Sequence, residues 1–154
     1  MSAKGCENDW WQVIIEDEDS LSGDSVAKTL SIIFNHLKPM LVVLDDIEGA
    51  GIGVLRKQSD VAGIEPSQLV EMLKAVVQLD WCDFYLVDND VVIKTMLKKP
   101  YWEIISSTIA TVRAVDDTYF YIYTKDYSLV QILFKEHPNA EIKKDDIKKL
   151  DYPF

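Results

Sequence analysis

The sequence is poor in cysteine and contains no long apolar run. Cys6 and Cys82 are its only cysteines. They are too few for a disulfide framework, and a zinc site would need further Cys or His ligands at short spacing. No apolar stretch approaches the roughly 20 residues of a membrane-spanning helix, and the first residues lack the apolar segment of a secretory signal. We therefore expect a cytoplasmic protein that is neither exported nor embedded in a membrane.

Basic side chains are scarce relative to acidic ones. The chain has 16 Lys and Arg against 26 Asp and Glu, which gives a formal net charge of -10 at pH 7. A field of this sign repels nucleic acids and anionic membrane surfaces, so we expect neither as a partner. It favours a cationic protein partner, because complementary potentials speed encounter. The alternative interpretation is that the acidity only keeps the protein soluble.

The sequence also lacks signatures of catalysis. It contains no Gly-x-Ser-x-Gly motif and no Gly-Lys-Ser or Gly-Lys-Thr. His36 and His137 fall near the ends of two expected helices, where the helix dipole favours a cation. A nucleophile–base pair of Cys82 with either histidine would require the fold to bring them together. We therefore expect a protein that is not an enzyme and that has no cofactor.

Three alternating glycines occur in LVVLDDIEGAGIGV, residues 41–54. A dinucleotide-binding turn needs the spacing G-x-G-x-x-G, but the third position is Val54 when counted from Gly49 and Arg56 when counted from Gly51. Such a turn is followed directly by a helix whose first amides bind the phosphates, but here the next helix is expected only near Pro66. We interpret the glycines as a turn or a bulge rather than a nucleotide site.

Two adjacent carboxylates, Asp45 and Asp46, follow the apolar part of this segment. Strand ends are common ligand sites in open sheets, and two carboxylates with a third from Asp88 or Asp90 would suit a divalent cation. The competing interpretation is that they only solvate the strand end. We therefore expect no metal ion, and keep a metal-dependent enzyme as an alternative.

The composition is that of a single globular domain. Hydrophobic residues make up 48% of the 154 residues and charged residues 27%, which separates the chain from disordered proteins and is enough for one core. We expect one domain over residues 1–154, with residues 1–9 as a frayed terminus.

Apolar periodicity predicts the elements. Strands are expected at 10–15, 40–44, 54–55, 81–87 and 91–94, and a hairpin is expected from arms 104–115 and 119–124 around Asp116-Asp117-Thr118. Helices are expected at 22–37 with Ser22 or Asp24 as the cap, from Pro66 through Leu79, and from a cap at Asp126 to a stop before Pro138. Residues 56–63 read as a loop and 88–90 as a turn, and the tail from Ala140 reads as a short strand or helical turn. We predict an α+β (mixed α/β) domain with a sheet of about five or six strands, three main helices, a β-α-β start and a C-terminal β-hairpin followed by a helix.

Aromatic residues alternate in the second arm of this hairpin. A period of two places Tyr119, Tyr121 and Tyr123 on one face of the strand. These rings either cover the sheet or form the centre of a partner-binding surface. In the second case acidic residues at the loop ends would surround them. The predicted partner-binding residues are Asp17, Glu18, Asp45, Asp46, Asp116, Asp117, Tyr119, Tyr121 and Tyr123.

In size, acidity, lack of a catalytic signature and possession of a Tyr-rich hairpin, the chain resembles the bacterial immunity proteins that neutralise cationic nuclease toxins. The resemblance is one of composition. It implies a small cytoplasmic inhibitor whose carboxylates take the place of the phosphates of the toxin's substrate. The alternatives are the metal-dependent enzyme and a homo-oligomer subunit that buries its tyrosine face against a second copy.

Overall fold

A six-stranded antiparallel sheet forms the centre of the protein. The computed structural model describes residues 8–17, 19–59, 63–88 and 97–153. Its strands are β1 (Asp9–Glu16), β2 (Leu41–Ala50), β3 (Gln78–Val87), β4 (Ala110–Val115), β5 (Tyr119–Thr124) and β6 (Glu141–Asp146). They lie in the order β2-β3-β4-β5-β1-β6, and every neighbouring pair is antiparallel. The predicted fold class is confirmed.

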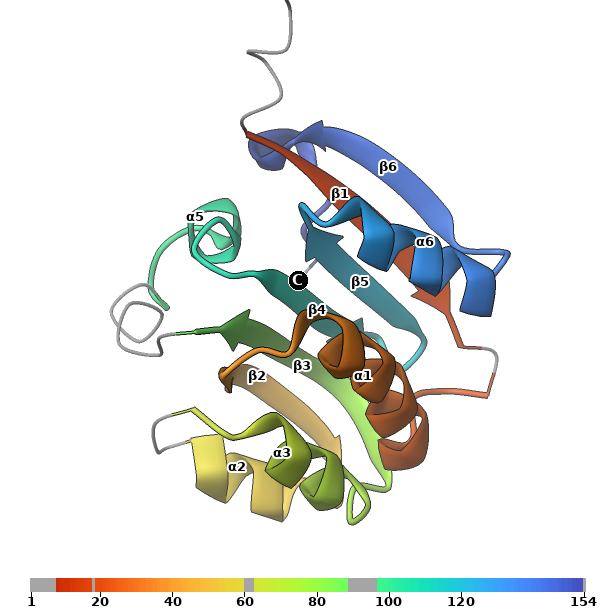
Figure 1. Ribbon diagram of the computed structural model, residues 1–154. Helices are drawn as coiled ribbons and strands as arrows, with labels where there is room; N and C mark the ends of the chain where they lie inside the picture. Colours follow the sequence, from red (N-terminus) through yellow and green to blue (C-terminus); the bar gives the residue numbers. More distant parts are fainter. Residues whose placement is uncertain (1–7, 18, 60–62, 89–96, 154) are drawn as a thin grey trace, which may run out of the picture.

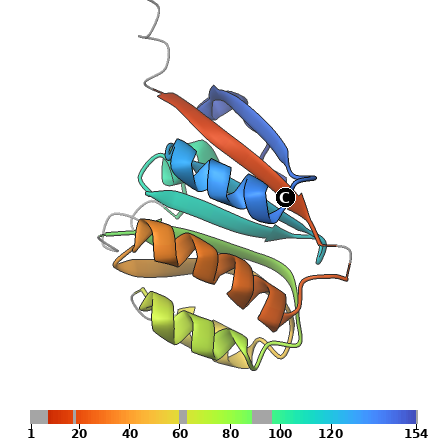
Figure 2. The same cartoon turned by 45° about the vertical axis from the view of Figure 1, so that its right-hand side comes forward.

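Three main helices cover one face of the sheet, which we call the helix face. They are α1 (Gly23–Leu37), α3 (Pro66–Leu73) and α6 (Tyr127–Glu136), and Figures 1 and 2 show them side by side in front of the strands. The predicted caps are present: the Ser22 hydroxyl accepts a hydrogen bond from Ser25 N at 3.1 Å, and Asp126 Oδ1 accepts one from Leu129 N at 3.1 Å. These bonds satisfy amides that the first turn of a helix leaves free.

The chain begins with the predicted β-α-β unit, but its two strands are not neighbours. Because each pair in the order β2-β3-β4-β5-β1 is antiparallel, β1 and β2 run parallel. They are separated by three strands, and α1 crosses the helix face between them (Figure 1). The apolar start of β2 is buried on both faces, as the continuous run Val42-Val43-Leu44 predicted.

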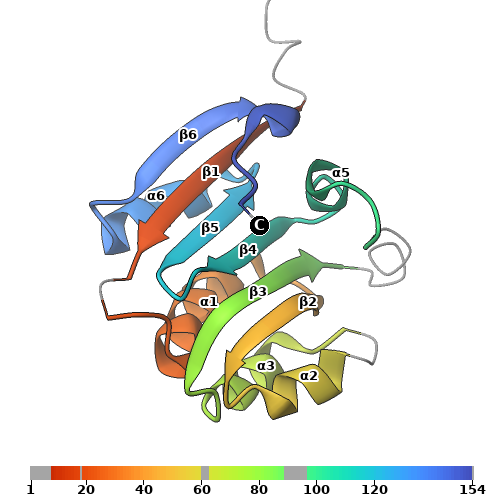
Figure 3. The ribbon, with the colours of Figure 1, turned by 180° about the vertical axis from the view of Figure 1, so that it is seen from behind.

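The opposite face, which we call the second face, has a thinner cover. Figure 3 shows it with the short helix α5 (Tyr101–Ile105) and the C-terminal segment lying over the strands. Ile104, Ile105, Ile147 and Leu150 are buried there against Tyr85 and Tyr123. Ile147 begins the 3-10 turn Ile147–Lys149, so the tail contains both the predicted strand and the predicted helical turn. Within the described ranges, this cover leaves an open groove at one end of the second face.

Four local predictions are wrong. Residues 54–55 are not a strand and 56–59 are not a loop, because α2 (Gly53–Ser59) is a helix that buries Leu55 and is preceded by buried Ile52. Helix α3 ends at Leu73 rather than Leu79, because Leu79 already belongs to β3. The first arm of the hairpin starts at Ala110 rather than 104, because residues 101–105 form α5.

Other predictions meet the limits of the described residues. Outside them lie the predicted strand 91–94, residues 60–62 of the predicted loop, Asn89 and Asp90 of the predicted turn, and residues 1–7 of the predicted frayed terminus. Asp9 begins β1 and pairs with Asp146. Among the described helices, none is both long and apolar enough to cross a membrane.

The alternating glycines form a bulge and a turn, as predicted. Gly49 has φ +152° and Gly51 has φ +72°, backbone conformations that side chains with a Cβ rarely adopt. A Cβ at Gly49 would lie 2.2 Å from the carbonyl oxygen of Gln78 on β3. The glycine therefore allows the end of β2 to approach β3.

We predict that Gly49→Ala lowers the free energy of unfolding by about 1–3 kcal/mol, because the new methyl group collides with a strand backbone at an unfavourable φ. Gly53→Ala is the matched control, since nothing lies within 4 Å of the Cβ position there. Urea denaturation of the two variants checks this. Equal stabilities for the two variants would contradict the assigned role of Gly49.

Candidate functional site

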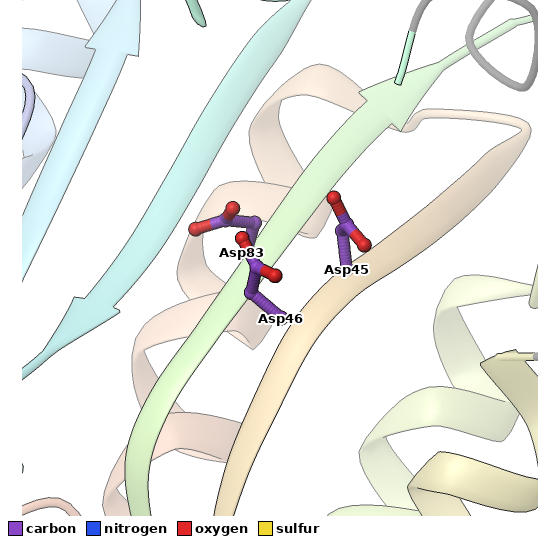
Figure 4. A group of neighbouring side chains, drawn as sticks. All are labelled: Asp45, Asp46 and Asp83. Carbon is purple, nitrogen blue, oxygen red and sulfur yellow. The ribbon is translucent and has the colours of Figure 1, made fainter. Parts of the chain in front are cut away.

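A bulge in β2 gathers three carboxylates on the second face. Asp45 pairs directly with Asp83 on β3, and the next pair is Glu48 with Trp81, so β2 has one extra residue in this interval. Asp46 lies in the bulge with φ 52°, a left-handed conformation that Asp tolerates. One carboxylate oxygen from each of Asp45, Asp46 and Asp83 lies within 4.8 Å of the others. Figure 4 shows these side chains, which we call the aspartate cluster, converging over the boundary between β2 and β3.

Arg113 on β4 neutralises part of this negative charge. It is the direct cross-strand partner of Asp83, and its Nε donates to Asp83 Oδ1 at 2.9 Å. Both side chains are 0% exposed. The hydroxyl of Tyr85 donates to the other carboxylate oxygen of Asp83 at 3.3 Å. The ion pair is therefore fully removed from water. Truncation of either partner would leave the other as an unpaired buried charge.

Two aromatic rings enclose the Arg113 guanidinium. Its Cζ lies 4.0 Å from the ring centroid of Tyr101 and 5.3 Å from that of Trp81. Among the described residues, neither Nη1 nor Nη2 of Arg113 has a hydrogen-bond partner. The rings offer their negative faces to the cation in place of such partners. The Tyr101 hydroxyl donates to Asp46 Oδ2 at 3.3 Å, so one ring links the guanidinium to the aspartate cluster.

Burial and like charges perturb the acid–base behaviour of the site. Burial raises the pKa of Asp83 to about 6, with smaller contributions from the charges of Asp46 and Asp45, although Arg113 opposes this shift. Burial, then the charge of Asp46, raises the pKa of Asp45. Burial and the charge of Asp83 raise the pKa of Tyr101 to about 12, so its hydroxyl stays protonated and able to donate.

An open groove of about 620 Å³ begins beside the aspartate cluster. We call it the acidic groove. Its lining contains five carboxylates, from Asp46, Glu48, Asp80, Asp116 and Asp117, together with Gln78 and the rings of Trp81 and Tyr101. None of these lining residues is basic. The groove therefore concentrates negative charge next to two aromatic side chains on the second face.

Local backbone geometry positions the acidic residues of the groove. Asp116 and Asp117 have φ 52° and 50°, a left-handed conformation that Asp tolerates in turns, and they begin the three-residue connection between the paired residues Val115 and Tyr119. Asp117 N donates to Asp80 O at 3.1 Å, which ties the turn to β3. The side-chain amide of Gln78 then donates to Asp80 Oδ1 at 2.7 Å and to Asp117 Oδ2 at 3.2 Å. One amide thus holds two carboxylates close together.

The structure brings some of the predicted partner-binding residues together and separates others. Asp46, Asp116 and Asp117 line the acidic groove, and Asp45 lies in the aspartate cluster. Asp17 lies beside the hairpin, where its backbone N donates to Thr118 O at 2.7 Å, and Glu18 lies outside the described residues.

The three tyrosines share the second face, as the period of two predicted, but they are not lining residues of the groove. Tyr123 is 0% exposed, and Tyr119 and Tyr121 are half-buried. The rings that accompany the gathered carboxylates are instead those of Trp81 and Tyr101.

Among the described residues, the third carboxylate beside Asp45 and Asp46 is Asp83 and not the predicted Asp88. Asp88 Oδ1 instead accepts a hydrogen bond from Met40 N at 3.3 Å, at the end of β3 where the predicted turn begins. The other predicted residue, Asp90, lies outside the described residues and stays a prediction. Three carboxylates at this spacing are a suitable ligand set for a hard divalent cation.

The predicted nucleophile and bases lie apart from this site. The Cys82 thiol is buried on the helix face, and burial raises its pKa, which disfavours the reactive thiolate. His36, in the last turn of α1, lies 2.7 Å from Ser128 Oγ and 3.4 Å from Asp126 Oδ2. His137 is the C-cap of α6. The histidines therefore lie at helix ends, as predicted.

The most important residues that sequence reasoning missed are Asp83 and Arg113. Each is a single charged residue inside an otherwise apolar or aromatic strand, in WCDFYLV and ATVRAV. Such residues are almost never fully buried unless they are paired. Two isolated charges of opposite sign in neighbouring strands could have predicted this ion pair.

Comparison of the chain with protein-family models, with curated proteins and with solved structures finds no match. The function must therefore be argued from the chemistry of the aspartate cluster and the acidic groove.

We predict that Asp83 titrates near pH 6 in the folded protein, against about 3.9 in an unfolded chain. As pH falls from 7 towards 5, the folded state takes up a proton that the unfolded state does not. The contribution of this group to the free energy of unfolding therefore rises as pH falls. Asp45→Asn should lower the titration midpoint, because it removes one of the charges that raise it.

Carbon-13 NMR of the Asp83 carboxyl group measures this midpoint directly. Asp116→Asn is the control, since it also removes one negative charge, but from a residue of the acidic groove that is not part of the aspartate cluster. A midpoint near 4 in the wild type, or equal shifts in the two variants, would show that the assigned electrostatics are wrong.

Proposed function

We propose that this protein binds a cationic protein partner through the acidic groove, and that it acts as an inhibitor of that partner rather than as an enzyme. The observation that carries the proposal is the gathering of five carboxylates and two aromatic rings around one open groove. A cytoplasmic location is part of the proposal, and the scarcity of cysteine supports it.

The electrostatics of the groove support a partner of positive charge. A hollow that is lined by charges of one sign focuses the field and speeds the encounter with a partner of opposite sign. The net charge of -10 adds a long-range attraction of the same direction. A basic protein such as a nuclease toxin presents a positive surface to the phosphates of its substrate, and the groove offers a similar arrangement of anionic oxygens.

The aromatic rings support an interface that lasts after the encounter. Exposed ion pairs alone are worth little, about 0–1 kcal/mol each. Half-buried Trp and Tyr side chains contribute large contact areas and are enriched among the residues that dominate binding energy. Trp81 and Tyr101 are side chains of this kind, and both line the groove together with its carboxylates.

We predict that the product of the adjacent gene, if it is the partner, binds with an affinity that falls as NaCl rises from about 50 mM to about 500 mM, because salt screens the charges of the groove. The double substitution Asp80→Asn with Asp117→Asn should weaken binding about tenfold or more at low salt. Calorimetric titration measures both effects.

The matched control is Glu65→Gln with Glu141→Gln. It removes two exposed carboxylates outside the groove and leaves the same net charge as the test variant. Equal losses of affinity in the two double variants would mean that overall charge, and not the groove, attracts the partner. Binding that does not respond to salt would also contradict the proposal.

A second candidate function is a metal-dependent reaction at the aspartate cluster. The spacing of Asp45, Asp46 and Asp83 favours it, and Arg113 compensates one of their three negative charges. A divalent cation would offset the burial, and to a smaller extent the like charges, that raise the pKa of Asp45 and Asp83.

For this candidate we predict that Mn²⁺ in excess raises the melting temperature, because a ligand that binds only the folded state stabilises it, by about 2.7 kcal/mol at one hundred times its Kd. Asp45→Asn should abolish the shift, whereas Asp80→Asn with Asp117→Asn should retain it. No shift in the wild-type protein with Mn²⁺, Mg²⁺ or Ca²⁺ would reject the metal site and leave the acidic groove unaffected.

A further inference from the structure

The two edges of the sheet differ in how their backbone groups are used. At the β2 edge, Val42 exchanges two backbone hydrogen bonds of 2.8 Å with Ile64. The Arg56 side chain donates to Ile47 O at the same edge, at 3.3 Å from Nε and 3.0 Å from Nη2. The other edge is β6, which lies beside β1 (Figure 1). Within the ranges that the structure describes, no segment pairs with the outer side of β6, and such an edge is a template for another strand.

The side chains of β6 divide between the two faces of the sheet. Ile142 is the cross-strand partner of Val13, which belongs to the buried core of the helix face. Opposite residues of an antiparallel pair share a face, so Ile142 points to the helix face. Side chains alternate along a strand, so Glu141 and Lys143 point to the second face. Ile142 is exposed and is the only uncharged residue of β6.

An apolar surface borders β6 on the helix face. Tyr127 and Phe134 lie seven residues apart on α6, and therefore on one side of it, and both are exposed. The flank of α6 that faces α1 is a different one, because it carries Ser128, whose Oγ lies 2.7 Å from His36 Nε2. Tyr127 instead packs against Trp11 of β1, with ring centroids 4.9 Å apart. The exposed flank of α6 therefore turns away from α1 and towards the β6 edge.

We propose that β6 is an interface between two copies of this chain. In the dimer the two β6 strands pair antiparallel about a two-fold axis, so each contact occurs twice. Ile142 lies opposite its own copy, and the two six-stranded sheets form one continuous sheet. This surface is separate from the tyrosine-bearing face of β5, and the inference does not rest on the proposed function.

The charges of β6 select this register. Because opposite residues share a face, the two-fold axis must place one residue directly opposite its own copy. Every residue of β6 except Ile142 is charged, so any other centre within β6 would bring two like charges together, which destabilises a sheet. With Ile142 at the axis, Glu141 lies opposite Lys143 of the second copy, and this pair occurs twice. Lysine on an edge strand ordinarily opposes pairing, but here a glutamate compensates it.

Apolar contact adds to these charge pairs. Exposed ion pairs are worth about 0–1 kcal/mol each, so two of them do not hold together copies that each carry a net charge of -10. Ile142 beside its copy removes apolar surface from water, which stabilises association. The rings of Tyr127 and Phe134 extend this apolar surface along the junction on both copies.

Sedimentation equilibrium of the full-length protein tests the interface. We expect the mass of two chains at concentrations up to about 100 µM. Ile142→Lys places two ammonium groups beside each other at the axis, and it should raise the dimer Kd about tenfold or more. Circular dichroism checks that the variant folds.

Exchange of charges tests the register. Glu141→Lys should weaken the dimer, because it places two lysines opposite each other at two positions. Lys143→Glu should weaken it likewise, although this substitution also removes a 3.9 Å contact between Lys143 Nζ and Asp151 Oδ2 within the chain. The two substitutions combined restore opposite charges in the same register and should recover most of the wild-type affinity. This recovery keeps the test decisive if Ile142→Lys fails to fold.

The controls separate the inference from the proposed function. Lys57→Glu makes the same charge change as Lys143→Glu on an exposed residue of α2, beside the opposite edge of the sheet, and it should leave the dimer Kd unchanged. Asp80→Asn with Asp117→Asn alters the acidic groove and should also leave it unchanged.

Four results would overturn the β6 interface. They are the mass of one chain at about 100 µM, a dimer that withstands Ile142→Lys, a charge-exchanged variant as weak as its single variants, and loss of the dimer in the groove variant. The first three would leave the proposal for the acidic groove intact.

Discussion

The buried ion pair between Arg113 and Asp83 is the interaction on which the second face of the sheet depends. Without the guanidinium, the cross-strand pair Asp45 and Asp83 would place two like charges directly opposite each other, which destabilises a sheet. The same guanidinium lies against the rings that line the acidic groove. The Arg113 guanidinium thus stabilises the carboxylate of Asp83 and also contacts the rings of Trp81 and Tyr101.

The two faces of the sheet differ in chemistry because their covers differ. Three amphipathic helices bury the helix face, where the cross-strand neighbours Phe84 and Val112 form part of a continuous apolar core. Among the described residues, α5 and the C-terminal segment cover the second face, and the acidic groove is open beside this cover. Buried charge within this face carries a desolvation cost that an apolar core would avoid. The cation-binding surface that we propose would be a functional reason to retain such charge.

Sequence reasoning predicted the elements that depend on local chemistry. The alternation of aromatic residues identified β5, and the capping residues Ser22 and Asp126 identified the starts of α1 and α6. It missed α2 and α5 because helices this short have few periodic positions. It predicted the carboxylates of the hairpin turn, but it did not predict the bulge, because the register between β2 and β3 is set by pairing between distant segments. The choice of Asp83 over Asp88 depends on that register.

Mutual stabilisation of Arg113 and Asp83 makes the effects of their substitutions on stability non-additive. A double-mutant cycle with Asp83→Asn and Arg113→Met, followed by urea denaturation, measures this coupling. We expect each single substitution to cost about 3–5 kcal/mol and the double variant to lose less than the sum by more than about 1.5 kcal/mol. Additive losses within about 0.5 kcal/mol would contradict it.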